Sequence, residues 1–147
     1  MPSWRNEFFV LSNKARIPAI GLGTYKIKGQ ESVDLAVHSS LNEGYRLIDT
    51  ASVYRNEGLI AKSVSGWKTI SREEIFLTSK LGPKDQGREK AKLAFEQTLR
   101  NLQTDYLDLY LIHWPGVQGF LVSIILSERR ILGDIIPVCP IIYTSPT

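Results

Sequence analysis

Cysteine is almost absent from this sequence, since Cys139 is the only one in 147 residues. No disulfide can form within the chain, which is typical of proteins from reducing compartments. The two histidines, His38 and His113, are too few and too scattered relative to Cys139 to predict a zinc site. We therefore expect neither a structural metal nor a disulfide scaffold.

Long apolar runs and dense charge are also missing. No stretch approaches the ~20 apolar residues that span a bilayer, and residues 1–7 lack the apolar segment of a secretory signal. The net charge is only +3, from 18 Lys and Arg against 15 Asp and Glu, without the basic stripe of a nucleic-acid-binding protein. These absences predict a cytoplasmic protein that binds neither membranes nor nucleic acids.

Two common nucleotide-binding motifs are not found. Gly21 and Gly23 begin a glycine motif, but Lys26 stands at the position of the third glycine of the dinucleotide fingerprint. No phosphate loop ending in Gly-Lys-Ser or Gly-Lys-Thr occurs. The sequence therefore predicts neither a Rossmann site nor a P-loop.

Short apolar segments alternate with amphipathic ones along residues 7–113. A hairpin is expected over residues 7–17, and Asn56 and Glu57 are expected to open a helix, with the acid where the helix dipole favours it. Strands are expected at 20–25, 45–49, 75–80 and 107–112, and the other helices at 30–42 and 87–102. This alternation predicts an α/β fold built from parallel βαβ units.

The composition changes after Gly119. Residues 120–126 are apolar except for Ser123, and residues 120–147 show neither a helical stripe nor a strand alternation. We therefore divide the chain into residues 1–119 and a divergent apolar tail, residues 120–147. The apolar run at its start is expected to promote aggregation.

Side chains with chemical capacity follow three successive predicted strands. Asp49, Lys80 and His113 stand at the strand ends, and Tyr54 lies in the loop after the first of them. Because parallel strands of a barrel bring their carboxyl ends to one face, we expect the four side chains to converge. His38 instead falls in the middle of a predicted helix, beside Val37, which indicates a structural role.

Together these four residue types suit the reduction of a carbonyl. A carbonyl that accepts a hydride becomes an alkoxide and needs a proton, which a tyrosine can donate when an ammonium stabilises the phenolate left behind. Lys80 would supply that ammonium, Asp49 would hold it, and His113 would polarise the carbonyl oxygen. A Schiff base on Lys80 is the alternative chemistry, but it leaves Tyr54 and Asp49 without a role. Singly, each residue has a plainer interpretation as a cap or surface residue, so the combination carries the prediction.

Four segments of the chain resemble motifs of the aldo-keto reductases, namely residues 21–25, 46–57, 77–81 and 105–115. The resemblance runs in order through residues 7–119, which makes it far more specific than one motif. It implies an NADPH-dependent (β/α)₈ barrel that reduces aldehydes or ketones, with Tyr54 as proton donor in a catalytic tetrad with Asp49, Lys80 and His113. It also implies that Thr24 and Asp49 contact the cofactor, and that the residues lining the substrate pocket are Tyr25, Val53, His113 and Trp114.

Only four strand positions of such a barrel are recognisable, whereas a complete one takes ~250 residues. We therefore expect an incomplete TIM-type barrel of about four βα units plus the hairpin. Its uncovered strand edges could lead to self-association. Such a chain is expected to bind NADPH weakly and to be weakly active or inactive. The alternative is a non-catalytic fragment that acts only through a partner.

Overall fold

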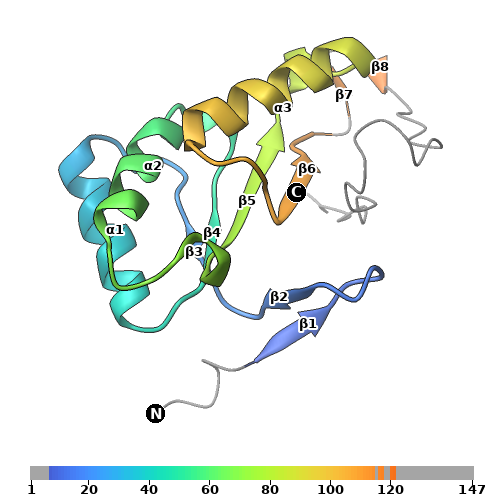
Figure 1. Ribbon diagram of the computed structural model, residues 1–147. Helices are drawn as coiled ribbons and strands as arrows, with labels where there is room; N and C mark the ends of the chain where they lie inside the picture. Colours follow the sequence, from blue (N-terminus) through green and yellow to red (C-terminus); the bar gives the residue numbers. More distant parts are fainter. Residues whose placement is uncertain (1–6, 115, 118–119, 122–147) are drawn as a thin grey trace, which may run out of the picture.

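The computed structural model describes residues 7–114, 116–117 and 120–121 of the chain. Its first element is an antiparallel hairpin, in which β1 (Phe8–Val10) pairs with β2 (Arg16–Pro18). This confirms the predicted hairpin. Figure 1 shows it apart from the main sheet, at the end where the strand β5 (Phe76–Leu81) begins.

A four-stranded parallel sheet forms the centre of the described structure. Its strand order is β3-β4-β5-β6, and the strands other than β5 are β3 (Leu22–Gly23), β4 (Leu47–Asp49) and β6 (Leu109–Ile112). The crossovers contain α1 (Gln30–Asn42), α2 (Glu57–Gly66) and α3 (Arg88–Leu102), and Figure 1 shows all three helices on the same side of the sheet. The predicted parallel α/β arrangement is confirmed, as four strand positions of a barrel-type sheet plus the hairpin.

The hydrophobic core lies between the sheet and the helices. Side chains of α1, α2 and α3 meet those that alternate strand residues direct to the same side. The buried members are Val33, Val37, Leu41, Ile48, Ile60, Ile75, Leu77 and Leu102. Because Leu77 faces this core, Lys80, three residues further along β5, faces the opposite side of the sheet.

Short 3₁₀ turns connect these elements, and they were not predicted. They are η2 (Ser52–Tyr54), η3 (Arg72–Glu74) and η4 (Pro83–Asp85). The strand β6 also begins two residues later than expected, at Leu109. The reason lies in Asp108, whose carboxylate accepts a hydrogen bond from the backbone N–H of Leu77 at 2.9 Å and pairs with Arg72 at 3.0 Å. A side chain therefore takes the donor that a longer strand would have paired.

A second hairpin crosses the boundary drawn at residue 119. The strands β7 (Gly116–Val117) and β8 (Phe120–Leu121) pair antiparallel, with Val117 opposite Phe120. Residues 122–147, which make up most of the predicted apolar tail, lie outside the described residues, so the division into two parts stays a prediction. Within the described part of the chain, no helix combines the length and the apolar character that crossing a membrane requires.

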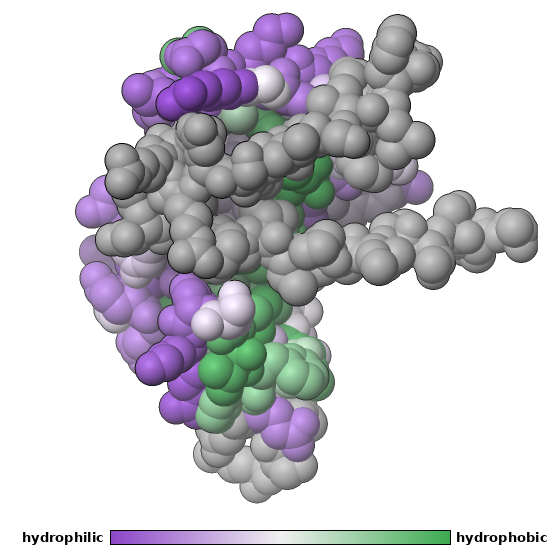
Figure 2. All heavy atoms as spheres, turned by 90° about the vertical axis from the view of Figure 1, so that its right-hand side faces the viewer, coloured by the Kyte–Doolittle hydropathy of each residue, from purple (hydrophilic) through white to green (hydrophobic). Residues whose placement is uncertain are grey.

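Several large apolar side chains of the N-terminal region are exposed, among them Phe9 at 67% and Val10 at 64%. Figure 2, which views the molecule from the right of Figure 1, shows hydrophobic surface near the lower end, where the hairpin lies. The hairpin therefore contributes little to the core between sheet and helices.

Candidate active site

The carboxyl ends of β4, β5 and β6 bring the predicted residues together. Asp49 is the last residue of β4, Lys80 is the penultimate residue of β5, and His113 directly follows β6. Tyr54 ends the η2 turn, which begins three residues after β4. Because β4, β5 and β6 are neighbouring parallel strands, their carboxyl ends lie at the same edge of the sheet, and these side chains converge there.

Lys80 and Asp49 form an ion pair at this edge. The Lys80 Nζ lies 2.7 Å from Asp49 Oδ1 and 2.6 Å from Oδ2, and it also donates to the carbonyl oxygen of Thr50 at 3.0 Å. The Lys80 side chain is only 15% exposed, while that of Asp49 is 36% exposed. Partial burial weakens solvent screening, so this pair fixes the ammonium more firmly than a surface pair would.

The ring of Tyr54 packs beside this ammonium. Its centroid lies 5.3 Å from Lys80 Nζ, which is within the range of a cation–π contact, and 5.5 Å from the His113 ring in an edge-on arrangement. The η2 turn is tied to β5 because the Ser52 hydroxyl donates to the carbonyl of Lys80 at 3.1 Å. Arg55 ends the turn with a left-handed φ of 58°. The local backbone thus holds Tyr54 against Lys80.

His113 is half-buried, and burial lowers its pKa below the usual value; the Lys80 charge lowers it further, whereas Asp49 opposes the shift. Its buried Nδ1 has no hydrogen-bond partner within the described residues. A neutral imidazole carries a single N–H, on either Nδ1 or Nε2. Such a ring can donate a hydrogen bond from Nε2.

Three residues predicted to line a substrate pocket are exposed near this cluster. The Tyr25 ring is 63% exposed and lies 5.0 Å from the Tyr54 ring, and Trp114 is 57% exposed and stacks on His113 at 5.7 Å. Val53, in the same turn as Tyr54, is 46% exposed. These side chains are available to a ligand.

Thr24, predicted to touch the cofactor, is 2% exposed, and its polar groups have partners inside the protein. Its backbone N–H and its hydroxyl both donate to the carbonyl of Asp49 at 3.0 Å, and its own carbonyl accepts from Asn56. In this arrangement Thr24 supports the end of β4, and a direct contact with a cofactor stays a prediction.

Asn56 and Glu57 do more than open a helix. The Asn56 side chain makes no cap hydrogen bond and instead bonds to two other segments, the turn over residues 24–27 and Thr50 after β4. Glu57 is 3% exposed, and its carboxylate accepts from Ser79 at 2.8 Å and from Asn101 at 2.9 Å. Sequence reasoning missed both roles because most of their partners lie 22 to 44 positions away along the chain. The burial of both side chains at the start of α2 indicates these roles, but burial can be seen only in the folded protein.

A second tyrosine near the sheet does not share this environment. Tyr110 lies on β6 on the side of the helices, where its ring packs edge-on against Phe95 of α3 at 5.1 Å. Burial raises the pKa of Tyr110 to about 12. It is therefore a poor proton donor, and it faces away from Lys80.

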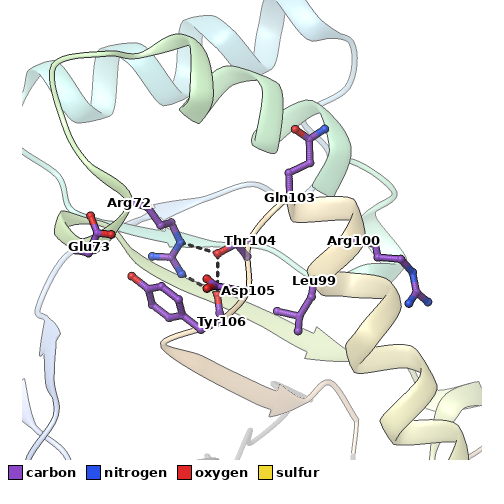
Figure 3. Close-up of a pocket in the computed structure, with 8 residues that line it drawn as sticks. All are labelled: Arg72, Glu73, Leu99, Arg100, Gln103, Thr104, Asp105 and Tyr106. Carbon is purple, nitrogen blue, oxygen red and sulfur yellow. Dashed lines mark hydrogen bonds between the residues drawn. The ribbon is translucent and has the colours of Figure 1, made fainter.

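A pocket of about 530 Å³ lies at the opposite end of the sheet, where β5 and β6 begin. Figure 3 shows the Arg72 guanidinium at its centre, hydrogen-bonded to the Thr104 hydroxyl and the Tyr106 carbonyl, while Arg100 points away. The guanidinium also lies 4.1 Å from the Tyr106 ring centroid. Because these contacts already use the charged group, the pocket indicates structural support and is a weaker candidate for the site than the opposite end of the sheet.

Comparison with known proteins gives consistent matches. Residues 19–120 match the sequence model of the Aldo/keto reductase family. A glyoxal reductase of Bacillus subtilis is 42% identical over 116 residues, which cover 79% of this chain and 42% of that protein. A methylglyoxal reductase of Salmonella typhimurium, DkgA, is 44% identical over 99 residues, or 67% of this chain and 34% of that protein.

Solved structures agree in fold. The aldo-keto reductase of Bombyx mori in complex with NADP matches with a TM-score of 0.71 at 32% identity, over 76% of this chain and 39% of that one. A Brucella melitensis aldo/keto reductase matches with a TM-score of 0.69 at 43% identity, over 74% and 41%. This chain thus spans about a third to two fifths of the length of these curated relatives.

Proposed function

Because this chain belongs to the aldo/keto reductase family, we propose that it reduces small aldehydes to alcohols with NADPH as the hydride donor. The observation that carries the proposal is the Lys80–Asp49 ion pair packed against the Tyr54 ring, with His113 alongside. Each of these groups supplies one requirement of carbonyl reduction.

In this proposal Tyr54 donates the proton to the forming alkoxide. The Lys80 ammonium stabilises the phenolate that remains, and Asp49 holds Lys80 beside the ring through two hydrogen bonds. The neutral His113 donates from Nε2 to the carbonyl oxygen, which orients the substrate and polarises its C=O bond. The lowered pKa of His113 favours the neutral donor at neutral pH.

When bound, NADPH supplies the hydride. Gly23 and Asp49, which are neighbours in the sheet register, would hold the nicotinamide end of the cofactor. Among the described residues, a Cβ on Gly23 would meet no atom within 4 Å, so this part of the surface would leave room for a ligand. The partly exposed carboxylate of Asp49 can accept a hydrogen bond there. Asp49 is thus proposed to hold the nicotinamide end, with Thr24 supporting the Asp49 backbone from behind.

The substrate class we propose is small α-oxoaldehydes. Tyr25, Val53 and Trp114 expose apolar surface beside the Tyr54 and His113 rings, which suits a short, weakly polar molecule. The names of two relatives, a glyoxal reductase and a methylglyoxal reductase, support the same class.

The proposed function is tested with the Tyr54→Phe variant. We expect the wild-type chain to oxidise NADPH slowly but measurably when methylglyoxal is added, followed by absorbance at saturating cofactor. Tyr54→Phe should lower this rate by at least ~100-fold, the scale of a lost general acid, with NADPH binding retained. Lys80→Met should be similarly severe because the phenolate loses its ammonium.

Tyr106→Phe is the matched control, since Tyr106 lies at the other end of the sheet. It should keep the wild-type rate. Near-normal turnover by Tyr54→Phe would contradict the role of Tyr54.

A second candidate is a non-catalytic role through association with a partner. The observation that favours it is the exposed apolar surface of the first hairpin, where Phe9 is 67% and Val10 is 64% exposed. Wild-type chain that shows no turnover at saturating NADPH, while remaining folded, would support this candidate over the reductase.

A further inference from the structure

We propose that Asn56 is a positioning residue, whose side-chain amide holds Tyr54 and Lys80 in their relative places. Its effect on catalysis rests on the proposed reductase function, whereas its effect on the geometry does not. Asn56 touches none of the reacting groups itself. It acts through two segments that do, the turn over residues 24–27 and the residue after β4.

The Asn56 side chain is buried and uses both ends of its amide. It is 2% exposed. Its Nδ2 donates to the carbonyl of Thr24 at 2.9 Å and to that of Ile27 at 3.2 Å, and its Oδ1 accepts from the hydroxyl of Thr50 at 3.0 Å. The side chain of Asn56 therefore bonds to residues up to 32 positions away along the chain. Such a buried, fully paired group fixes a single arrangement of its partners.

The first arm of this network, the two hydrogen bonds from Asn56 Nδ2 to the carbonyls of Thr24 and Ile27, supports the turn that carries the Tyr25 ring. Residues 24–27 form a turn closed by the Ile27 N–H to the Thr24 carbonyl at 3.2 Å, with Lys26 at a left-handed φ of 63°. That conformation is unfavourable for a lysine, so external support from Asn56 helps to hold the turn. Tyr25, inside this turn, packs its ring 5.0 Å from that of Tyr54. The first arm thus supports one side of the proton donor.

The second arm, the hydrogen bond from the Thr50 hydroxyl to Asn56 Oδ1, positions an acceptor of the Lys80 ammonium. Thr50 is completely buried, and its N–H donates to the Thr78 carbonyl at 2.9 Å. Its carbonyl accepts a hydrogen bond from Lys80 Nζ, beside the two bonds to Asp49. The hydrogen bond from the Thr50 hydroxyl to Asn56 fixes the orientation of Thr50. A shift of Thr50 would therefore displace an acceptor of Lys80.

Two variants separate the two arms. Thr50→Val replaces the hydroxyl by a methyl group of similar size and breaks the second arm. As a rescue, Thr50→Ser keeps the hydroxyl and should restore most of what Thr50→Val loses. Asn56→Asp keeps the acceptor for Thr50 but removes both N–H donors of the first arm. Thr98→Val is the matched control, since Thr98 is equally buried, at 1%, but lies in α3 on the helix side of the sheet.

The geometric readout is NMR of the purified chain and needs no turnover. The Lys80 ammonium should give a slowly exchanging proton signal in the wild type, because its side chain is only 15% exposed and is hydrogen-bonded. We expect Thr50→Val to lose or shift this signal, and Asn56→Asp to lose the contact between the Tyr25 and Tyr54 ring protons. Thr98→Val should keep both. Both signals unchanged in Thr50→Val and Asn56→Asp would overturn the proposal.

The kinetic readout is kcat against KM for methylglyoxal reduction. Thr50→Val should lower kcat by about 10-fold or more, as expected for a displaced catalytic group, with little change in the KM for NADPH. A wild-type chain without turnover would refute the proposed function alone, since the NMR signals still decide the role of Asn56. Equal kinetic losses in Thr50→Val and Thr98→Val would instead indicate a merely structural role and overturn the proposal.

Discussion

His113 is the residue of the site whose charge responds to pH near neutrality. Its pKa lies below the usual value of about 6.5, first because the ring is partly buried and then because Lys80 is close. The folded protein therefore binds this proton less tightly than the unfolded chain does. The neutral ring contributes to stability above pH ~6.5, and this contribution is lost as the pH falls through the folded pKa.

We accordingly expect His113→Gln to flatten the acid side of the stability profile. The wild type should lose more thermal stability between pH 7 and pH 5 than the variant does, because only the wild type must protonate this ring. The measurement is Tm by circular dichroism at several pH values for both proteins. Parallel Tm profiles for the two proteins would show that His113 does not carry the effect.

Among the elements, α3 is followed by a C-cap residue, Gln103, whose left-handed backbone conformation is unfavourable for a residue with a Cβ. Gln103 follows the helix with φ 52° and ψ 44°, in the left-handed region, and the N–H of Thr104 bonds back to the carbonyl of Leu99. Glycine is the residue that helices favour at this position, because a Cβ is strained there. Glutamine therefore leaves some stability unrealised.

We expect Gln103→Gly to stabilise the protein by about 0.5–1 kcal/mol, since relief of the left-handed strain exceeds the added freedom of the unfolded chain. Gln97→Gly is the matched control: Gln97 is an exposed residue inside the same helix, where glycine costs about 1 kcal/mol. Urea unfolding of both variants measures the two changes. A loss of stability in Gln103→Gly would mean that the left-handed turn is not retained in solution.

At the scale of the whole molecule, the described sheet has four parallel strands whose carboxyl ends carry the proposed chemistry. In barrels of this type the phosphate site is frequently built by the loops after the seventh and eighth strands. Within the described residues, the proposed contacts of NADPH therefore involve its nicotinamide end. Dinucleotide phosphates usually supply much of the binding energy through helix N-termini and basic groups.

We therefore expect the 147-residue chain to bind NADPH more weakly than its full-length relatives do. A fluorescence titration of NADPH with the chain and with the glyoxal reductase of Bacillus subtilis measures the difference. Equal micromolar affinity for both proteins would contradict the expectation, and would mean that residues 122–147 contribute a phosphate site.

Much of the element pattern could be read along the chain because its causes are local. The helix 30–42 was predicted at its observed bounds, since Val33, Val37 and Leu41 repeat at helical spacing and Gly44 follows. Asp49, Lys80 and His113 could be singled out because each directly ends a strand or nearly so. The alternation of strands and helices then required a parallel sheet, which brings strand ends together.

What the chain could not reveal is which polar groups meet across the sheet and its loops. The partners of Asn56 lie up to 32 positions away, and those of Glu57 lie 22 and 44 positions away. Asp108 shortens β6 by capturing the N–H of Leu77 from another strand. Thr24 turns inward because the carbonyl of Asp49 offers it two hydrogen bonds. Such pairings follow from the satisfaction of buried polar groups after the layers have packed, and no local propensity encodes them.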